Sequence, residues 1–211
     1  RFLTQKQEPL AIELVKSLTK QYSPLFLLQH LFEPVLVRTG DDWLQGIIDI
    51  STEHFISGVV EHLIASISEE NRNQPQKNLK VALVVPGAEE HVITLKMAAE
   101  HFRYSGWNVY YLGRSLPIVD FHRLISEQAI DLVVLSVTIS HHINSADHFI
   151  QALRLMPSKH PFSILVAGRA FEDSPQAIDL INPDYYVPTL KALEQLIPTI
   201  ENQLLTLRAS G

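Results

Sequence analysis

The chain has 211 residues, of which 46% are hydrophobic and 19% are charged, proportions typical of a folded globular protein. Its net charge of −6 argues against direct binding of nucleic acid, which depends on Lys and Arg contacts with phosphates. The absence of cysteine excludes disulfides, thiolate metal sites and cysteine nucleophiles. No apolar run reaches the roughly 18 residues of a membrane span and no signal peptide is visible, so we expect a soluble cytoplasmic protein. Because the chain begins at Arg1 rather than Met, we expect a fragment.

Residues 1–70 carry helical patterns. Apolar side chains recur at every fourth position in the first of them, the spacing of one helix face. This pattern predicts a helix over 8–22, and its members are Leu10, Leu14, Leu18 and Tyr22. Ser23 and Pro24 then predict the N-cap and the first position of a second helix. We expect that helix to reach about Val37 and to end at Gly40.

A third helix is expected after a short irregular passage at 41–46. It begins near Ser51 or Thr52 and runs to about Ser68. Three helices with apolar faces predict an incomplete helical bundle, and we expect its fourth helix to lie upstream of this sequence.

The chain changes character near residue 72. Residues 71–78 are polar throughout and include Pro75, so we expect a linker over 71–79. From residue 80 to 211, short apolar stretches rich in β-branched and aromatic side chains alternate with helical ones. The expected strands are Lys80–Pro86, Asn108–Gly113, Asp131–Thr138, Phe162–Ala170 and Asp184–Pro188. The expected helices are 94–105, 118–129, 144–156, 174–182 and 189–205.

Continuous apolar strands that alternate with helices are typical of a parallel sheet covered on both faces. The second part therefore predicts a flavodoxin-like or Rossmann-like, doubly wound α/β domain with a five-stranded sheet. The flavodoxin-like strand order 2-1-3-4-5 places a ligand beyond the carboxyl ends of strands 1 and 3. The loop that follows the first strand is therefore the first place to look for a functional site.

That loop contains Glu89 and His91. A histidine that ligates a metal needs its second ring nitrogen bonded to an acceptor, usually a carboxylate, which fixes the tautomer. Glu89 lies two residues before His91 and is suited to this role. The alternative is a solvated acidic loop with an incidental histidine.

This loop resembles the D-x-H-x-x-G motif of cobalamin-binding domains, with Glu89 for Asp, His91 as the histidine and Thr94 for Gly. The resemblance implies that His91 is the lower ligand to cobalt and that Glu89 is its partner. Thr94 departs from the motif, because the glycine lets the nucleotide tail of the cofactor pass close to the backbone.

Further residues match the same family. Ser136 and Thr138 lie at the end of the third strand, where the family has hydroxyl groups that contact the buried tail. Ala167 and Gly168 stand where the family has a Gly-Gly step after the fourth strand. The resemblance implies that Ser136, Thr138 and Gly168 bind the cofactor.

The helical part adds a second resemblance. Trp43, nine further residues and then Glu53-His54 form a W-x9-E-H pattern similar to that of CarH-type light-dependent repressors of the MerR family. In that group the tryptophan covers the upper face of cobalt-bound 5′-deoxyadenosine, and the Glu and His contact or guard the same region. Some members carry a His directly after the Trp that ligates cobalt after illumination, but this chain has Leu44, so another donor, His54 or water, would be needed.

These resemblances imply a non-enzymatic sensory module that binds cobalamin between a helical cap and the α/β domain. The form of the cofactor that they imply is adenosylcobalamin. We expect a homo-oligomer that acts on DNA only through a domain absent from this sequence, with no membrane partner. Two alternatives stay open: a corrinoid carrier for methyl transfer, which would be part of an enzyme, and a haem or bilin sensor on the same fold. No Walker A motif, G-x-G-x-x-G turn or H-E-x-x-H motif is present.

Overall fold

The protein is described by a computed structural model that covers residues 2–68, 76–158 and 160–209. The chain divides into two compact units, Arg1–Asn73 and Gln74–Gly211. The linker expected over 71–79 lies mostly outside the described residues. Within the described parts, no helix is both long enough and apolar enough to cross a bilayer.

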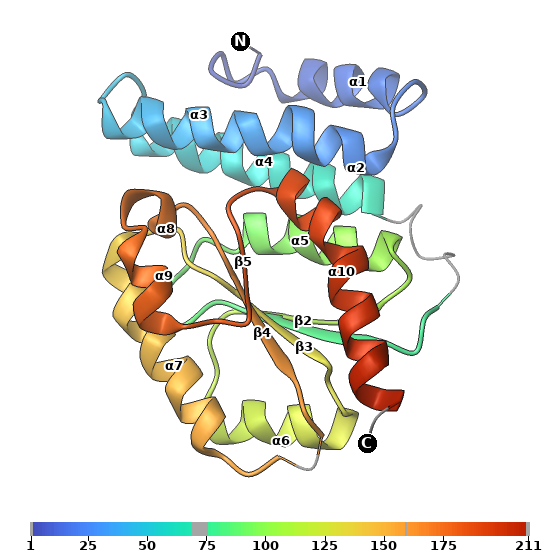
Figure 1. Ribbon diagram of the computed structural model, residues 1–211. Coiled ribbons are helices and arrows are strands. Elements are labelled where there is room, and N and C mark those ends of the chain that lie inside the picture. Colours follow the sequence, from blue (N-terminus) through green and yellow to red (C-terminus); the bar gives the residue numbers. More distant parts are fainter. Residues whose placement is uncertain (1, 69–75, 159, 210–211) are drawn as a thin grey trace. The chain divides into compact units, whose positions relative to one another are not determined.

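The first unit, which we call the helical unit, is built from helices alone (Figure 1). Its elements are α1 (Glu8–Leu18), α2 (Pro24–Leu27), the π-helical turn η1 (Leu28–Phe32), α3 (Glu33–Leu44) and α4 (Ile50–Ser68). The elements α2, η1 and α3 follow one another without a break. Ser23 accepts a hydrogen bond from the backbone N–H of Phe26, which confirms the predicted N-cap. The core of this unit is apolar and includes Leu28, Phe32, Ile56, Val60, Leu63 and Ile64.

The first helix differs from its prediction in length and in its packed face. It ends at Leu18 instead of residue 22. Its buried residues are Ala11 and Val15, whereas Leu10 and Leu14 each keep 43% of their surface exposed. The four-residue spacing identifies an apolar stripe on a helix, but it does not decide whether a neighbour covers that stripe.

The second long helix also differs from its prediction, because it does not end at Gly40. Helix α3 continues through Gly40 to Leu44, so the irregular passage expected at 41–46 is mostly helical. The left-handed glycine that follows the helix is Gly46, directly after the C-cap residue Gln45, and its φ of +69° suits the end of a helix. The backbone N–H of Gly46 donates to the carbonyl of Trp43. A glycine inside a helix costs only about 1 kcal/mol, so Gly40 does not stop it.

The second unit, which we call the α/β unit, is a parallel five-stranded sheet of order β2-β1-β3-β4-β5. Its strands are β1 (Lys80–Val84), β2 (Asn108–Gly113), β3 (Leu132–Ser136), β4 (Ser163–Ala167) and β5 (Tyr185–Val187). The helical elements are α5 (Ile93–Tyr104), α6 (Ile118–Gln128), η3 (Ser140–His142), α7 (Ile143–Leu155), α8 (Ala170–Asp173), α9 (Gln176–Ile181) and α10 (Leu190–Ala209). The predicted fold class and strand order are confirmed.

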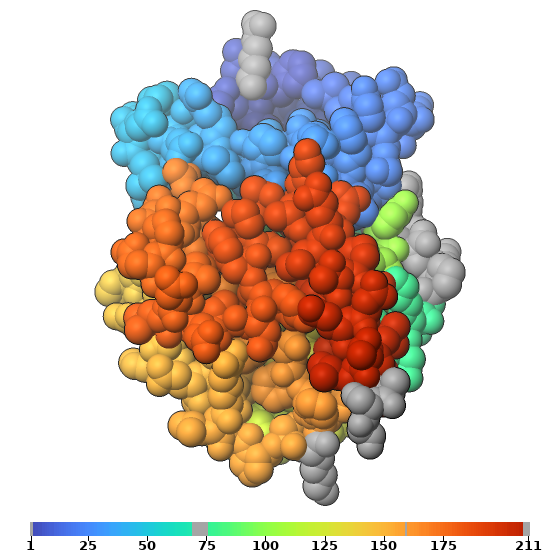
Figure 2. Space-filling view, in the orientation of Figure 1, coloured from blue at the N-terminus to red at the C-terminus, as the bar shows by residue number. Residues whose placement is uncertain are grey.

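Helices cover both faces of the sheet, as Figure 1 shows. In Figure 2, the near face of the α/β unit is formed mainly by the segments from α7 to α10, coloured orange to red. Helices α6, α7 and α9 pack on one face, where they form a continuous apolar core with β1, β3 and β4. Helices α5 and α10 pack against each other, and they contact β1 and β5 respectively. The fourth strand ends at Ala167 instead of the predicted residue 170, because residue 170 is already the first residue of α8. Helix α10 runs four residues beyond its predicted end and contains Pro198.

At the amino ends of the strands, one buried carboxylate contacts three separate segments of the chain. Asp131, which is 2% exposed, precedes β3. It accepts hydrogen bonds from the backbone N–H of Lys80, 2.8 Å away, from His160 Nε2, 3.0 Å away, and from Arg208 Nη2, 2.5 Å away. This carboxylate therefore connects the start of β1, the segment before β4 and the end of α10.

Candidate functional site

The strand order reverses direction between β1 and β3, which is the topological switch point of the sheet. The loops that follow these two strands form the place where doubly wound folds bind ligands. The loop after β1 turns at Gly87, which has a φ of +58°. A Cβ atom added there would lie 2.8 Å from the side chain of Ser145, so only glycine lets this loop approach α7 so closely.

Glu89 and His91 meet on this loop as expected. Their contact joins His91 Nδ1 to Glu89 Oε1 over 2.5 Å. The Glu89 side chain is fully buried, while that of His91 is 51% exposed. Because Nδ1 is bonded to the carboxylate, Nε2 is the nitrogen suited to ligate a metal, which is the arrangement that metal-binding histidines need.

The carboxylate of Glu89 also reaches the loop after β3. Its Oε1 accepts from the backbone N–H groups of Glu90 and His91, each 3.1 Å away. Its Oε2 accepts from the backbone N–H groups of Thr138, 2.9 Å away, and Ile139, 3.2 Å away. One carboxylate therefore sets the orientation of His91 and joins the two loops of the switch point.

These hydrogen bonds explain how the buried Glu89 stays ionised. Burial by itself raises the pKa of a carboxyl group, but the hydrogen bonds from His91, Thr138 and Ile139 outweigh burial and lower the pKa of Glu89 to about 2. The carboxylate is therefore anionic at neutral pH. A permanent negative charge against Nδ1 keeps the proton on that nitrogen and raises the basicity of the other one.

Ser136 is the other notable polar group at the switch point. It is 2% exposed, and its hydroxyl has no hydrogen-bond partner among the described residues. A buried hydroxyl without a partner costs free energy, so this group is suited to meet a polar atom of a ligand. Thr138 follows two residues later and contributes its backbone N–H to Glu89, while Thr94 lies half-buried in the first turn of α5.

Gly168 has a backbone reason to be glycine. Its φ is +114°, a region that residues with a Cβ rarely adopt. A Cβ atom at this position would lie 2.1 Å from the carbonyl oxygen of Val137. Gly168 therefore lets the loop after β4 lie directly against the end of β3, next to Ser136.

The helical unit holds the other three predicted residues. Trp43 lies near the end of α3 and is 43% exposed. On α4, His54 Nδ1 is 2.5 Å from Glu53 Oε2, and the hydroxyl of Ser57 donates to Glu53 Oε1 over 2.7 Å. His54 is thus a second imidazole oriented by a carboxylate, and its side chain is 74% exposed.

Sequence reasoning missed several features of these sites. It did not find the bonds from Thr138 and Ile139 to Glu89, because backbone donors leave no trace in residue identity. It also missed an apolar surface after Trp43, where Leu44, Ile47 and Ile50 are 70%, 60% and 48% exposed. Within the described residues, no three His, Asp or Glu side chains group as a metal site, so a metal bound through His91 would have to bring its other ligands with it.

Comparisons with known proteins identify the family of this chain. The family model "B12 binding domain" matches residues 79–192. The HTH-type transcriptional repressor CarH of Myxococcus xanthus is 26% identical over 172 residues, which are 81% of this chain and 56% of the repressor. The chain therefore spans little more than half the length of that relative. The resemblance to CarH-type cobalamin-binding domains is confirmed.

Two solved structures share the fold. The monomethylamine corrinoid protein of Methanosarcina barkeri has a TM-score of 0.79 at 12% identity and covers 93% of both chains. A cobalamin-binding protein of Desulfitobacterium hafniense has a TM-score of 0.53 at 14% identity and covers 94% of this chain and 95% of its own. At these identities the likeness shows the fold alone.

The residues of the switch point fit a corrinoid. Such a cofactor brings most of the ligands of its cobalt with it, so one imidazole, His91, oriented by Glu89, would be enough to hold it from the protein side. The buried hydroxyl of Ser136 offers a partner to a polar group that enters beyond β3. The predicted cofactor, cobalamin, is confirmed.

Proposed function

We propose that this chain, which belongs to the B12-binding domain family and takes cobalamin as its cofactor, is a regulatory module rather than an enzyme and senses light through adenosylcobalamin. The observation that carries the proposal is the W-x9-E-H pattern of the helical unit, in which Glu53 orients His54 and Trp43 keeps an exposed ring. The CarH repressor, which is 26% identical, supports a role in transcription.

Each site residue has a task in this proposal. His91 binds the cobalt through Nε2, and Glu89 holds the imidazole in the tautomer that this requires. Ser136, Thr138, Thr94 and Gly168 border the space for the nucleotide tail. Trp43, Glu53 and His54 would contact the adenosyl group, because an indole ring can cover an apolar-edged group. When bound, adenosylcobalamin supplies a cobalt–carbon bond that light breaks.

The signal is a change between two states that the ligand biases. Trp43 would contact the adenosyl group in only one of the two states, so the presence of that group would set the balance between them. We propose that the change is read as a different oligomeric state or as altered activity of an attached DNA-binding domain. The net charge of −6 means that this chain would act on DNA only through such a domain.

An absorption experiment tests the proposal. The purified chain is incubated with adenosylcobalamin in the dark, free ligand is removed, and spectra are recorded before and after green light. We expect retained cobalamin whose spectrum changes on illumination and whose oligomeric state changes with it. His91→Ala should lose the spectrum of histidine-ligated cobalamin, and His148→Ala, which changes an exposed histidine of α7, should keep it. Retained cobalamin with no light-induced change either in oligomeric state or in the pattern of limited proteolysis would reject the sensor.

A corrinoid carrier for methyl transfer is the second candidate, because the methylamine corrinoid protein shares the fold over 93% of both chains. The two functions differ in the upper ligand that they favour. A sensor prefers adenosylcobalamin to methylcobalamin, and Trp43→Ala removes that preference because the indole contacts the adenosyl group. A carrier retains methylcobalamin at least as well, whichever residue stands at position 43. Competition dialysis with the two cobalamins measures this preference directly.

A further inference from the structure

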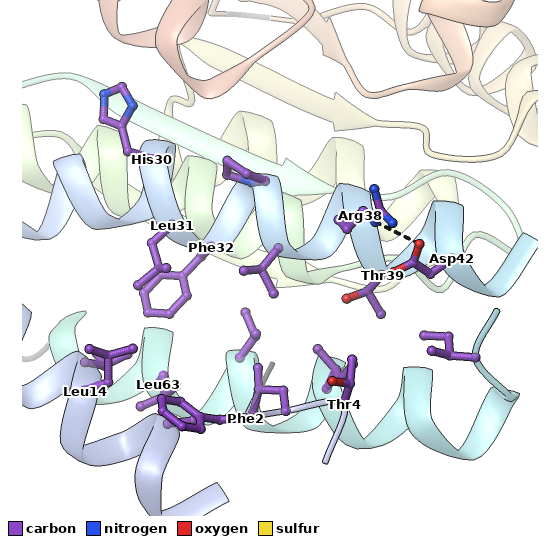
Figure 3. A pocket seen from close by; sticks show the side chains of 18 residues that line it. Phe2, Thr4, Leu14, His30, Leu31, Phe32, Arg38, Thr39, Asp42 and Leu63 are labelled. Carbon is purple, nitrogen blue, oxygen red and sulfur yellow. Dashed lines mark ion pairs between the residues drawn. The ribbon is translucent and has the colours of Figure 1, made fainter. Parts of the chain in front are cut away.

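The helical unit encloses a pocket of about 550 Å³ that none of the predicted cofactor residues lines. This volume lies within the range of about 300–1,000 Å³ that small-molecule sites have. Figure 3 shows that Leu31 and Phe32 point across the pocket towards Leu63, Phe2 and Leu14. The pocket is therefore formed by the N-terminal segment, α1, η1, α3 and α4, all within one unit.

The pocket has an apolar body and one polar end. The polar end is formed by Thr4, Arg38, Thr39 and Asp42, and His30 lines the pocket away from that end (Figure 3). Arg38 Nε lies 2.8 Å from Asp42 Oδ1, so the two charges offset each other. A charged ligand would have to disturb this ion pair or place its own charge in apolar surroundings, which is costly. The charge balance therefore favours an uncharged occupant.

The ion pair leaves acceptor capacity at the polar end. Asp42 Oδ1 is buried and lies 2.8 Å from Arg38 Nε, and a carboxylate oxygen can accept a second hydrogen bond. Thr39, one helical turn earlier, is 5% exposed. The remaining acceptor position of Asp42 Oδ1 is therefore suited to a donor that belongs to the occupant.

The wall of the pocket contains an irregular helical turn. Residues 28–32 form the π-helical turn η1, and three of them, His30, Leu31 and Phe32, line the pocket. Single π-helical turns are rare within helices and often mark functional sites. The Phe26 ring packs against the His30 ring in a tilted arrangement, with 4.3 Å between centroids. This turn is a second observation, independent of the pocket's volume, that points to a ligand.

We propose that this pocket is a second ligand site, which takes a small, uncharged, apolar molecule with one hydrogen-bond donor. The apolar body lies among the side chains of Leu14, Leu31, Phe32 and Leu63, and the donor faces Asp42 Oδ1. This inference is independent of the proposed function, because none of these residues belongs to the cofactor site.

The probe for this site is N-phenyl-1-naphthylamine, which is uncharged, has a single N–H donor and fluoresces strongly in apolar surroundings. We expect a saturable rise in fluorescence with one molecule bound per chain. The N-methylated form of the probe, which lacks the donor, should bind several-fold more weakly. A rise without saturation would overturn the proposal, and equal binding of the two probes would overturn the assignment of the donor.

Two variants on α1 form a matched pair. Leu14 lines the pocket and Leu10 does not, yet each is 43% exposed, so tryptophan is tolerated at either position with similar effect on folding. Leu14→Trp should fill the pocket and weaken probe binding at least about tenfold, while Leu10→Trp should bind like the unchanged chain. If both variants weaken binding equally, the probe sits on the apolar surface of α1 and the pocket is not its site.

A third variant removes the polar end, and a fourth separates the two sites. Asp42→Leu should weaken the N–H probe but leave the N-methylated probe nearly unchanged, since only the first uses the acceptor. His91→Ala should leave the binding of both probes unchanged, because His91 lies in the α/β unit. Circular dichroism melts of all variants show whether each is folded, and loss of probe binding in a folded His91→Ala chain would overturn the proposal.

Discussion

Acid should weaken the α/β unit through one buried side chain, His101. This residue lies in α5 with none of its surface exposed, and neither ring nitrogen has a hydrogen-bond partner among the described residues. Burial lowers the pKa of His101 to about 4, although the nearby charge of Glu194 acts in the opposite direction. The folded protein therefore resists protonation of a ring that the unfolded chain protonates readily.

The size of the effect follows from the two pKa values. The unfolded chain binds the proton near pH 6.5, whereas the folded chain binds it near pH 4. Stability from this residue is thus fully present above pH 6.5 and declines as the pH falls from 6.5 to 4, because the unfolded state binds more protons in that window. Between pH 7 and pH 5 the loss is about 2 kcal/mol.

The assay compares urea unfolding at pH 7 and pH 5. The chain has two tryptophans, so a Trp43→Phe background leaves Trp107 as the reporter. Trp107 is 3% exposed and packs on Phe102 with ring centroids 5.2 Å apart, and it therefore reports the α/β unit.

His101→Phe removes the titrating ring nitrogens while keeping a ring of similar size. We expect this variant to lose about 2 kcal/mol less than its parent between the two pH values. His148→Gln, at an exposed position of α7, serves as the control and should behave like the parent. Equal pH dependence in the parent and in His101→Phe would refute the reasoning.

Four other substitutions test the packing and the site. Gly168→Ala places a Cβ against a backbone carbonyl and should cost about 3 kcal/mol or more in urea unfolding, whereas Gly58→Ala in α4, where the Cβ meets nothing within 4 Å, should stabilise by about 0.5–1 kcal/mol. Asp131→Asn should cost about 2 kcal/mol in the same assay, since it weakens the bond to the partly exposed Arg208. Glu89→Gln should lower cobalamin affinity in equilibrium dialysis about 10- to 100-fold, and unchanged affinity would contradict its role beside the histidine.

The α/β fold could be predicted from the sequence because its three central strands are buried on both faces. Each of them contains a short, continuous apolar run, as in Leu132–Ser136, and a helical stretch separates each strand of the sheet from the next. A parallel sheet covered on both faces buries such runs. The loop with Glu89 and His91 was found for the same reason, since the end of the first strand fixes its place at the edge of the sheet.

The sequence also identified the histidine of the site and the carboxylate that orients it, since Glu89 and His91 lie two positions apart and their contact is local. The second contact of Glu89, with the backbone of Thr138 and Ile139, joins residues about 50 positions apart. Backbone N–H groups are the same for nearly every residue type, so no sequence pattern reports this bond.

In the helical unit, local sequence patterns did not predict which helix face is buried or where a helix ends. Leu10 and Leu14 have the spacing of a packed helix face, yet the structure buries Ala11 and Val15 instead. Gly40 looks like a helix end, but Gly46 takes the left-handed cap. The side a helix buries depends on which helices lie beside it, so the sequence determined the elements of this protein, and only the tertiary structure decided which faces they buried and where a pocket was left between them.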